Sequence, residues 1–279
     1  YYNEKLIDLI GVKPRLANTK ISQDFFDLAA STQSIFEENL FKILRYLYKK
    51  TKSKNLFYNG GCAMNSLANG KILENTDFQD LHISFAPSDL GCSIGSVLYQ
   101  KGIKKKKLWR LPVTPYLGPS FSQKEVKDLL ESNKIKYKIQ KNFVQNVAQL
   151  ISKNKIGAWF HGSMEFGERA LGNRSIIADP RDANVKEKIN KLIKFREFYR
   201  PLAPAVKIES VKNVFNSNTK SEFMESAVKV NKSWENKIKG VIHEDHTSRI
   251  QVVSKKTNPL FWKLIDEFEK ITSIPLIVN

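Results

Sequence analysis

The stretch at residues 161–206 reads HGSMEFGERALGNRSIIADPRDANVKEKINKLIKFREFYRPLAPAV, and it is unusually rich in arginine. The chain has 46 Lys and Arg residues, of which only nine are Arg. Five of these nine fall here, within 32 residues: Arg169, Arg174, Arg181, Arg196 and Arg200. A guanidinium binds phosphate or carboxylate through two parallel hydrogen bonds, which an ammonium cannot do. The pattern favours a pocket for a phosphorylated small molecule, and a set of interdomain salt bridges is the alternative.

Other residues of the same stretch fit an anion pocket. Gly167 and Gly172 flank residues 168–171 and would let backbone N–H groups approach an anion. His161 follows an expected strand and is either a donor to the ligand or a structural histidine. Three cations lie within seven residues: Lys194, Arg196 and Arg200. Their mutual repulsion requires a bound anion or acidic neighbours.

Length and composition limit the class of protein. The 279 residues suggest one large or two ordinary domains, and 41% hydrophobic residues suffice for a packed core. No apolar run approaches the roughly 20 residues that span a bilayer, so we expect no membrane segment. Cys62 and Cys92 suggest no disulfide framework, which favours the reducing cytoplasm. The chain opens with Tyr1 and stops after a strand-like segment, so we expect both ends to be cuts inside a longer protein.

The net charge of +18 invites a nucleic-acid interpretation. Much of the excess is scattered Lys, with one block at residues 104–107. Aromatic and basic residues do not alternate as a stacking surface for single strands requires. We therefore do not expect nucleic acid to be the principal ligand.

Hydrophobic periodicity predicts a mixed α/β fold, because strands, glycine turns and helices alternate along the chain. The expected helices cover residues 22–50, 62–73, 91–100, 122–133, 142–154, 183–193 and 258–271. The expected strands cover residues 55–58, 81–85, 134–139, 156–160, 241–243 and 249–253, and the end of the chain is strand-like. A domain boundary is expected near 101–120, and 208–240 reads as an irregular, mobile loop.

Two strand-to-helix turns carry candidate ligand groups. Gly60 and Gly61 would let a base or phosphate press against backbone near Asn65, although a plain tight turn explains the pair equally well. Asp89 follows the next expected strand, where it could bind a metal or a ribose hydroxyl. Taken alone, it is better explained as a helix N-cap. At residues 243–246, two His three positions apart could suggest a metal, but a loop beside a phosphate-binding Arg249 fits better.

Four segments together resemble the O-carbamoyltransferase family of antibiotic and nodulation-factor biosynthesis. They read NGGCAMNSLANGKI, MEFGERALGNRSIIADPR, KFREFYRPLAPAV and HEDHTSRIQVV, and the resemblance covers nearly the whole chain. It implies the C-terminal part of an actin-like, RNase H-like ATPase domain at 1–110. A YrdC-like α/β domain would follow at 111–279, cut before its C-terminal end.

The resemblance also implies a two-step reaction. Carbamoyl phosphate and ATP would give carbamoyl-adenylate, and the carbamoyl group would then pass to an acceptor hydroxyl. Mg²⁺ and Fe²⁺ or another divalent metal would be the cofactors. The residues matching the family's site for carbamoyl phosphate and the ATP phosphates are His161, Arg169, Asn173, Arg174, Lys194, Arg196, Arg200 and Arg249. Arg169, Arg174, Lys194 and Arg196 would act in catalysis, Gly60, Gly61 and Asn65 would bind nucleotide, and Asp89 would bind metal.

This sequence departs from the family pattern at the metal site. The family's HxxxH pair and an N-terminal catalytic His are absent from the 279 residues. Two other functions therefore remain open: a threonylcarbamoyl-type protein acting on tRNA, and a nucleotide-binding module without catalysis. The sequence allows a homodimer and does not identify the acceptor.

Overall fold

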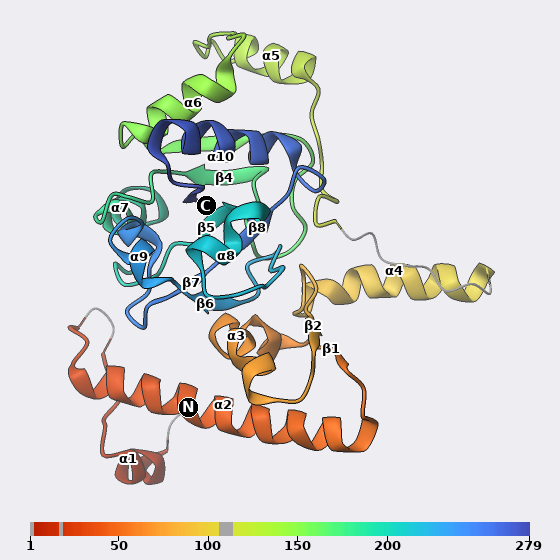
Figure 1. The fold of residues 1–279 in the computed structure, drawn as a ribbon, viewed down its shortest axis with the longest axis vertical. Coiled ribbons are helices and arrows are strands. Elements are labelled where there is room, and N and C mark those ends of the chain that lie inside the picture. Colours follow the sequence, from red (N-terminus) through yellow and green to blue (C-terminus); the bar gives the residue numbers. More distant parts are fainter. Residues whose placement is uncertain (1–2, 17–18, 106–113) are drawn as a thin grey trace. The chain divides into compact units, whose positions relative to one another are not determined.

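The computed structural model describes residues 3–16, 19–105 and 114–279 (Figure 1). Its contacts divide the chain into two compact units. One unit comprises residues 1–56 and 72–81, and the other comprises 57–71 and 82–279. The expected boundary near residue 110 lies outside the described residues, and the division at 110 stays a prediction. The side chains of the Lys block at 104–107 also lie outside the described part of the structure.

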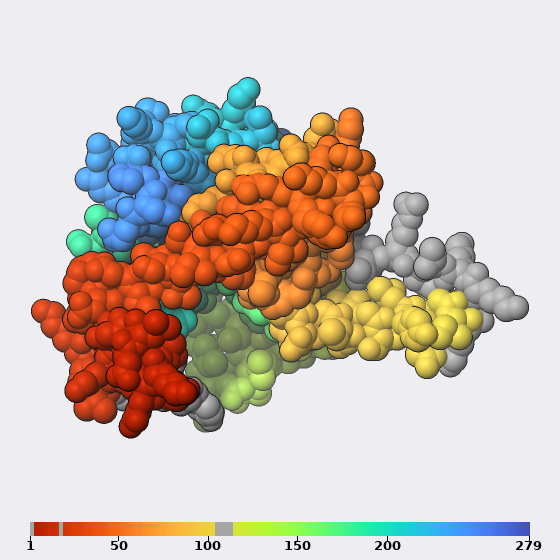
Figure 2. Space-filling view, turned by 90° about the horizontal axis from the view of Figure 1, so that it is seen from below, coloured from red at the N-terminus to blue at the C-terminus, as the bar shows by residue number. Residues whose placement is uncertain are grey.

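The first unit is built on the long helix α2 (Gln23–Thr51), preceded by the short helix α1 (Glu4–Ile10). Only Phe41 and Leu44 of the described α2 side chains are buried, and Figure 2 shows how much of its surface, in red and orange, stays exposed. Tyr48 meets Phe78 edge to face, with ring centroids 5.4 Å apart. The expected helix at 22–50 is confirmed.

Short elements follow α2. Strands β1 (Asn55–Phe57) and β2 (Asp80–His82) pair in a two-stranded sheet. A 3-10 turn (Gly61–Met64) leads into helix α3 (Ser66–Asn75), and helix α4 covers Leu90–Lys105. The strand, glycine turn and helix order expected for this region is confirmed with shifted ends.

The second unit has its core in a three-stranded sheet with strand order β8-β5-β9. Strand β5 (Pro204–Lys207) runs parallel to β8 (Gln251–Val253) and antiparallel to β9 (Leu276–Val278). The antiparallel pair β3 (Gly157–Phe160) and β4 (Arg174–Ile177) joins this sheet through a bridge between Ala178 and Val278. Strands β6 (Ala227–Lys229) and β7 (Thr247–Arg249) form a separate antiparallel pair.

Helix α10 (Pro259–Thr272) covers the sheet and packs on α6 (Phe143–Ser152), as Figure 1 shows. Its fully buried side chains recur at helical spacing: Phe261, Leu264, Ile265 and Phe268. Asn258 caps the helix by accepting the N–H of Phe261 at 3.1 Å. Each such apolar side chain contributes roughly 1.5–3 kcal/mol when buried.

The other described helices of this unit are shorter. They are α5 (Gln123–Ser132), α7 (Val185–Ile189), α8 (Val211–Val214) and α9 (Lys232–Glu235). A π-helical turn (Asn190–Lys194) and 3-10 turns (Ile208–Ser210 and Lys239–Val241) complete the set. Within the described residues, no helix combines the length and the apolar character needed to cross a bilayer.

Three sequence expectations are wrong. Residues 134–139 form no strand and are exposed throughout. Residues 241–243 begin in a 3-10 turn rather than a strand. The supposed mobile loop at 208–240 contains α8, β6 and α9 and buries Val214, Phe215 and Ile238 completely. The expectation that 156–160 is a buried strand holds for its pairing, but of β3 only Trp159 is buried. The helices expected at 122–133, 142–154 and 258–271 are confirmed.

Candidate functional site

A buried carboxylate organises the arginine-rich loop at residues 165–174. Glu165 is only 8% exposed, and its Oε1 accepts the backbone N–H groups of Leu171 at 2.7 Å and Asn173 at 2.8 Å. The N–H of Arg174 approaches the same oxygen at 3.2 Å. Three N–H donors on one carboxylate fix the loop's curvature. Sequence reasoning missed Glu165, although it lies within the segment that carried the resemblance.

Side chains from distant segments hold the loop from the other side. The Leu171 carbonyl accepts from the Tyr116 hydroxyl at 2.9 Å and from Gln251 Nε2 at 2.8 Å. Asn258 donates to the Tyr116 oxygen at 3.0 Å and to Asn173 Oδ1 at 2.9 Å. Asn279 donates to the Ala170 carbonyl at 3.1 Å. Because burial removes water, the pKa of Tyr116 rises to about 12, and its hydroxyl stays a donor.

The two glycines of the loop have a packing role. Gly167 has φ +112°, and a Cβ there would lie 2.5 Å from the Phe85 carbonyl oxygen. Gly172 has φ +99°, and its Cβ would lie 2.3 Å from the Phe261 ring. The Gly172 N–H donates to Ser175 Oγ at 2.9 Å. The Gly172 N–H is therefore occupied by a hydrogen bond within the loop.

Beside this loop, four cations line a cavity of about 140 Å³. They come from three segments: Arg169 from the loop, Lys194 and Arg196 from the π-helical turn and its end, and Arg249 from β7. Among the described lining residues Glu168 is the only carboxylate, and it bonds to the Ser88 hydroxyl. Among the described residues, no acid lies within salt-bridge distance of any of the four cations. These four are among the eight residues that the resemblance assigned to carbamoyl phosphate and the ATP phosphates.

The electrostatics of the cavity are unbalanced. Burial, with Arg169 and Arg196 nearby, lowers the pKa of Arg249 to about 10. Burial and the charges of Arg196 and Arg249 also lower the pKa of Lys194. With a pKa of about 10, Arg249 remains protonated at neutral pH. Within the described chain, the enclosed Nε of Arg249 has no hydrogen-bond partner. Arg249 is partly buried, and an enclosed guanidinium N–H without a partner among like charges favours a bound anion.

The other expected phosphate-binding residues lie elsewhere. Arg174 stacks on Phe160, with 3.6 Å from its Cζ to the ring centroid. Its guanidinium donates to four backbone carbonyls: Pro119, His161, Gly162 and Asn173. Asn173 is buried and bonds to Asn258 and the Ser163 carbonyl. Both residues thus hold the loop, and neither lines the cavity.

Neither His161 nor Arg200 lines the four-cation cavity, although the charge of Arg200 acts on Arg196. His161 is at the surface beside Arg174, where desolvation and the Arg174 charge lower its pKa. Arg200 pairs with Glu197 at 2.8 Å. The acidic neighbour expected to offset repulsion is therefore present for Arg200.

The turn at residues 243–246, just before β7, supplies no metal cluster among the described residues. His243 Nδ1 lies 3.0 Å from Thr247 Oγ1, and His246 Nδ1 lies 3.2 Å from Glu235. These contacts shape the turn that presents Arg249. Throughout the described ranges, no group of three or more His, Cys, Asp or Glu could hold a metal ion.

The glycine turn at residues 60–65 belongs to the same unit as the cavity. Added Cβ atoms at Gly60 and Gly61 would meet nothing within 4 Å in the described structure, so both backbones are accessible. Asn65 Oδ1 accepts the Ala68 N–H at 3.1 Å and so caps α3. Buried Asn69 then donates to the Glu225 carbonyl at 2.8 Å, which ties this helix to the segment that carries Met224 of the cavity.

Asp89 is exposed at the start of α4, and its carbonyl accepts the Cys92 N–H at 3.0 Å. One exposed carboxylate does not make a transition-metal site, which needs three or more protein ligands. The described residues therefore do not fit an iron centre by themselves. Cys62 and Cys92 are both free and exposed.

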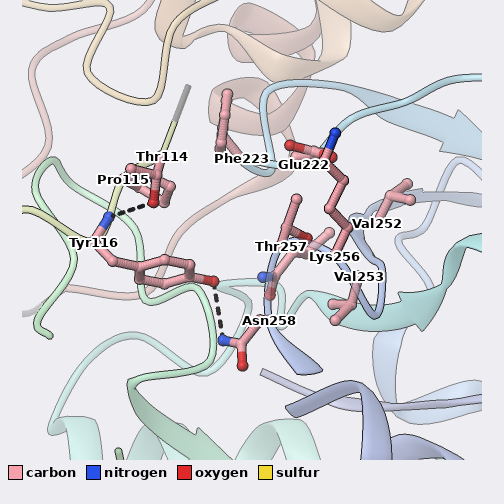
Figure 3. Close-up of a pocket in the computed structure, with 11 residues that line it drawn as sticks. Thr114, Pro115, Tyr116, Glu222, Phe223, Val252, Val253, Lys256, Thr257 and Asn258 are labelled. Atoms are coloured by element: carbon pink, nitrogen blue, oxygen red, sulfur yellow. Dashed lines mark hydrogen bonds between the residues drawn. The ribbon is translucent and has the colours of Figure 1, made fainter. Parts of the chain in front are cut away.

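A second cavity, of about 250 Å³, is lined by Tyr116 and Gln251, the two side chains that donate to the Leu171 carbonyl (Figure 3). Tyr116 and Asn258 form one wall, and Glu222 and Lys256 lie together at the opposite side. Burial raises the pKa of Glu222, while the charge of Lys256 opposes this shift. The second cavity is lined in part by apolar side chains, among them Pro115, Phe223 and Val253. It therefore does not share the cationic character of the first cavity.

Comparison with known proteins covers both halves of the chain. A family model described as carbamoyltransferase N-terminus matches residues 2–98, and one described as carbamoyltransferase C-terminus matches 148–279. The chain is 34% identical, over 97% of its length, to nodulation protein NolO of Bradyrhizobium diazoefficiens, of which it covers 51%. It is 30% identical, over 99% of its length, to the Synechocystis protein named uncharacterized protein sll1178, of which it covers 50%.

The chain thus spans about half the length of these curated relatives. Among solved structures, it is similar to HypF of T. kodakarensis, with 19% identity and a TM-score of 0.34. That similarity covers 50% of this chain and 17% of HypF, and it is too weak to support an argument.

Proposed function

Because this chain belongs to the carbamoyltransferase family, we propose that its four-cation cavity binds carbamoyl phosphate and the phosphates of ATP. The observation that carries this proposal is Arg249, whose enclosed Nε has no partner within the described chain. Arg169, Lys194 and Arg196 share the cavity with it. A phosphate supplies the charge and the acceptor atoms that this set lacks.

The proposed reaction joins the carbamoyl group to AMP. Carbamoyl phosphate, ATP and one water would give carbamoyl-adenylate, pyrophosphate and phosphate. ATP would enter as its magnesium complex. The cations would align two polyanions that otherwise repel each other and would stabilise charge on the departing pyrophosphate. The carbamoyl group would then pass to an acceptor hydroxyl with release of AMP.

The proposed domain arrangement follows the same family. Residues 111–279 would belong to a YrdC-like domain that forms the adenylate, and 1–110 to an actin-like domain that takes part in transfer. Gly60, Gly61 and Asn65 would face nucleotide in the transfer half. Asp89 would contribute one ligand to a metal whose other ligands lie outside these residues, and no step here is derived through that metal.

The first half-reaction gives the direct test. Labelled pyrophosphate should exchange into ATP only when carbamoyl phosphate is present and without any acceptor. Arg249→Met should reduce this exchange by about a hundredfold or more, because it removes a desolvated charged donor. Exchange that needs no carbamoyl phosphate, or that survives Arg249→Met, would contradict the proposal. Nanomolar binding of tRNA at physiological salt would favour the threonylcarbamoyl alternative instead.

A further inference from the structure

The segment that follows α7 places two aromatic side chains in a groove beside the four-cation cavity. The chain makes a π-helical turn over Asn190–Lys194, a rare geometry that often marks functional sites. The turn ends at Phe195, whose φ of +46° is unusual for an aromatic residue. Lys194 and Arg196 consequently line the four-cation cavity, whereas Phe195 lines an open groove outside it.

One buried side chain fixes the segment. Asn190 is fully buried, and its Nδ2 donates to the carbonyls of Phe198 at 3.2 Å and Arg200 at 2.8 Å. Its Oδ1 accepts from Arg196 Nε at 2.7 Å, and its carbonyl accepts the Arg196 N–H at 3.1 Å. Residues 196–200 are therefore held at several points by the protein interior.

Two aromatic rings nevertheless remain exposed on this fixed segment. Phe195 is 84% exposed and Phe198 is 68% exposed, and both line the groove, whose volume is about 650 Å³. Exposed apolar side chains held on an ordered backbone mark a binding surface. Their planar faces suit a planar partner.

Arg196 connects the groove to the cation cavity, because it lines both. A ligand with phosphates beside Arg249 and Lys194 could extend past Arg196 and place its other end over the rings. Carbamoyl phosphate is too small to do so and has no ring. A nucleotide has both a polyphosphate and a planar base with polar edges, and Glu187 and Glu197 in the groove can accept N–H groups from that edge.

We propose that this groove is a nucleobase site, in which the purine of ATP stacks on Phe195 and Phe198 while its phosphates occupy the four-cation cavity. The inference rests on the proposed function, since it requires the polyphosphate to lie in that cavity. It assigns a role to two residues that the cation cluster alone does not explain. Base stacking on an aromatic ring commonly changes affinity by roughly tenfold per ring.

The test compares a ligand that has a base with one that lacks it. Calorimetric titration of the protein with the magnesium complexes of ATP and of inorganic triphosphate should give at least about tenfold tighter binding of ATP. Phe195→Ala and Phe198→Ala should each weaken ATP by about tenfold and leave triphosphate unchanged. Phe198→Tyr should retain ATP binding, and Phe198→Leu should not. Unchanged triphosphate binding also shows that each variant is folded.

Leu192→Ala is the matched control. Leu192 is 65% exposed in the same segment but does not line the groove, so its loss should alter neither affinity. Equal binding of ATP and triphosphate by the unmodified protein would overturn the inference and leave the proposed function intact. An equal loss of both ligands in the Phe variants would also overturn it. Failure of triphosphate to bind at all, or its binding unchanged in Arg249→Met, would reject the proposed function and this inference with it.

Discussion

The Glu165 carboxylate and the Asn173 backbone N–H lie 2.8 Å apart, across the base of the loop that carries Arg169. The same oxygen also accepts from Leu171, so one buried acid closes the loop. This closure helps to fix the backbone that presents Arg169 to the cavity. The acid is therefore a positioning residue for the proposed phosphate site.

Glu165→Ala should destabilise the protein by roughly 3 kcal/mol, because it leaves buried N–H donors without an acceptor. Urea denaturation followed by circular dichroism would measure the change. Glu165→Gln keeps one acceptor oxygen and should lose less. Glu38→Ala, on the exposed surface of α2, is the control and should leave stability essentially unchanged. A Glu165→Ala variant as stable as this control would refute the closing role.

Arg249→Met should raise the stability of the protein and weaken its binding of pyrophosphate. The lowered pKa of Arg249 means that folding disfavours its charged form, so an apolar side chain of similar length should raise the free energy of unfolding by about 1 kcal/mol or more without ligand. Pyrophosphate affinity should fall at least about tenfold. Thermal denaturation and calorimetric titration measure the two effects.

Arg181→Met is the contrasting variant. The Arg181 guanidinium pairs with buried Asp179 at 2.6 Å, so its removal should lower stability and leave pyrophosphate binding unchanged. If Arg249→Met destabilised the protein as Arg181→Met does, Arg249 would be a structural residue.

Arg174 and Arg196 should respond oppositely to replacement by Lys. Arg174→Lys loses the planar fork that donates to four carbonyls and stacks on Phe160, so it should cost roughly 1–3 kcal/mol of stability with little change in anion affinity. Arg196→Lys should weaken pyrophosphate binding several-fold. Measuring both quantities in both variants decides the point, and weaker anion binding with unaltered stability in Arg174→Lys would restore it as a phosphate ligand.

Glu225 should make stability depend on pH. Burial raises its pKa from 4.5 to about 7 in the folded protein, although hydrogen bonds from backbone N–H groups oppose the shift. Between pH 4.5 and 7 the Glu225 carboxyl is ionised in the unfolded chain and protonated in the folded chain. The contribution of Glu225 to the free energy of unfolding is therefore fully present below pH 4.5 and is lost as the pH rises through 7. The loss should amount to about 3 kcal/mol.

Urea titrations from pH 4.5 to 8 would measure this dependence. Glu225→Gln should remove the slope and match or exceed the unmodified protein in stability at pH 8. Glu209→Gln, with a carboxylate that accepts from Trp262 Nε1 at 3.2 Å, is the control and should keep the slope. Parallel curves for the unmodified protein and Glu225→Gln would show that Glu225 is ionised in the fold.

Periodicity predicted the long elements well. Helices α2, α6 and α10 each repeat apolar residues over ten or more positions, so local pattern and burial agree. Residues 134–139 alternate Lys with Ile and Tyr like a strand, but they lie exposed and outside every described sheet. The prediction for residues 208–240 was wrong in the opposite way, because the segment is ordered. Helices and strands of three or four residues are too short to show a hydrophobic period, even where Phe215 and Ile238 are buried.

The sequence indicated the positive charge of the candidate site better than the function of each arginine. The choice of Arg over Lys indicated an anion pocket, and Arg169, Arg196 and Arg249 do share a cavity. The same signal included Arg174, because a guanidinium that holds carbonyls looks like one that awaits phosphate in sequence. Glu165 left no signal beyond its segment, since an acid in a loop usually faces solvent.

The contact between Asn69 and Glu225 has a consequence for how the chain can be divided. Residues 57–71 and 82–105 pack with 114–279 in one unit, and a Cβ at Gly70 would lie 1.8 Å from the Ala227 carbonyl oxygen. The Phe85 and Phe223 rings also meet edge to face at 5.7 Å. Two polypeptides divided between residues 105 and 114 should therefore associate when expressed together. The break in sequence would be repaired by fragment complementation, and the two halves should then purify together.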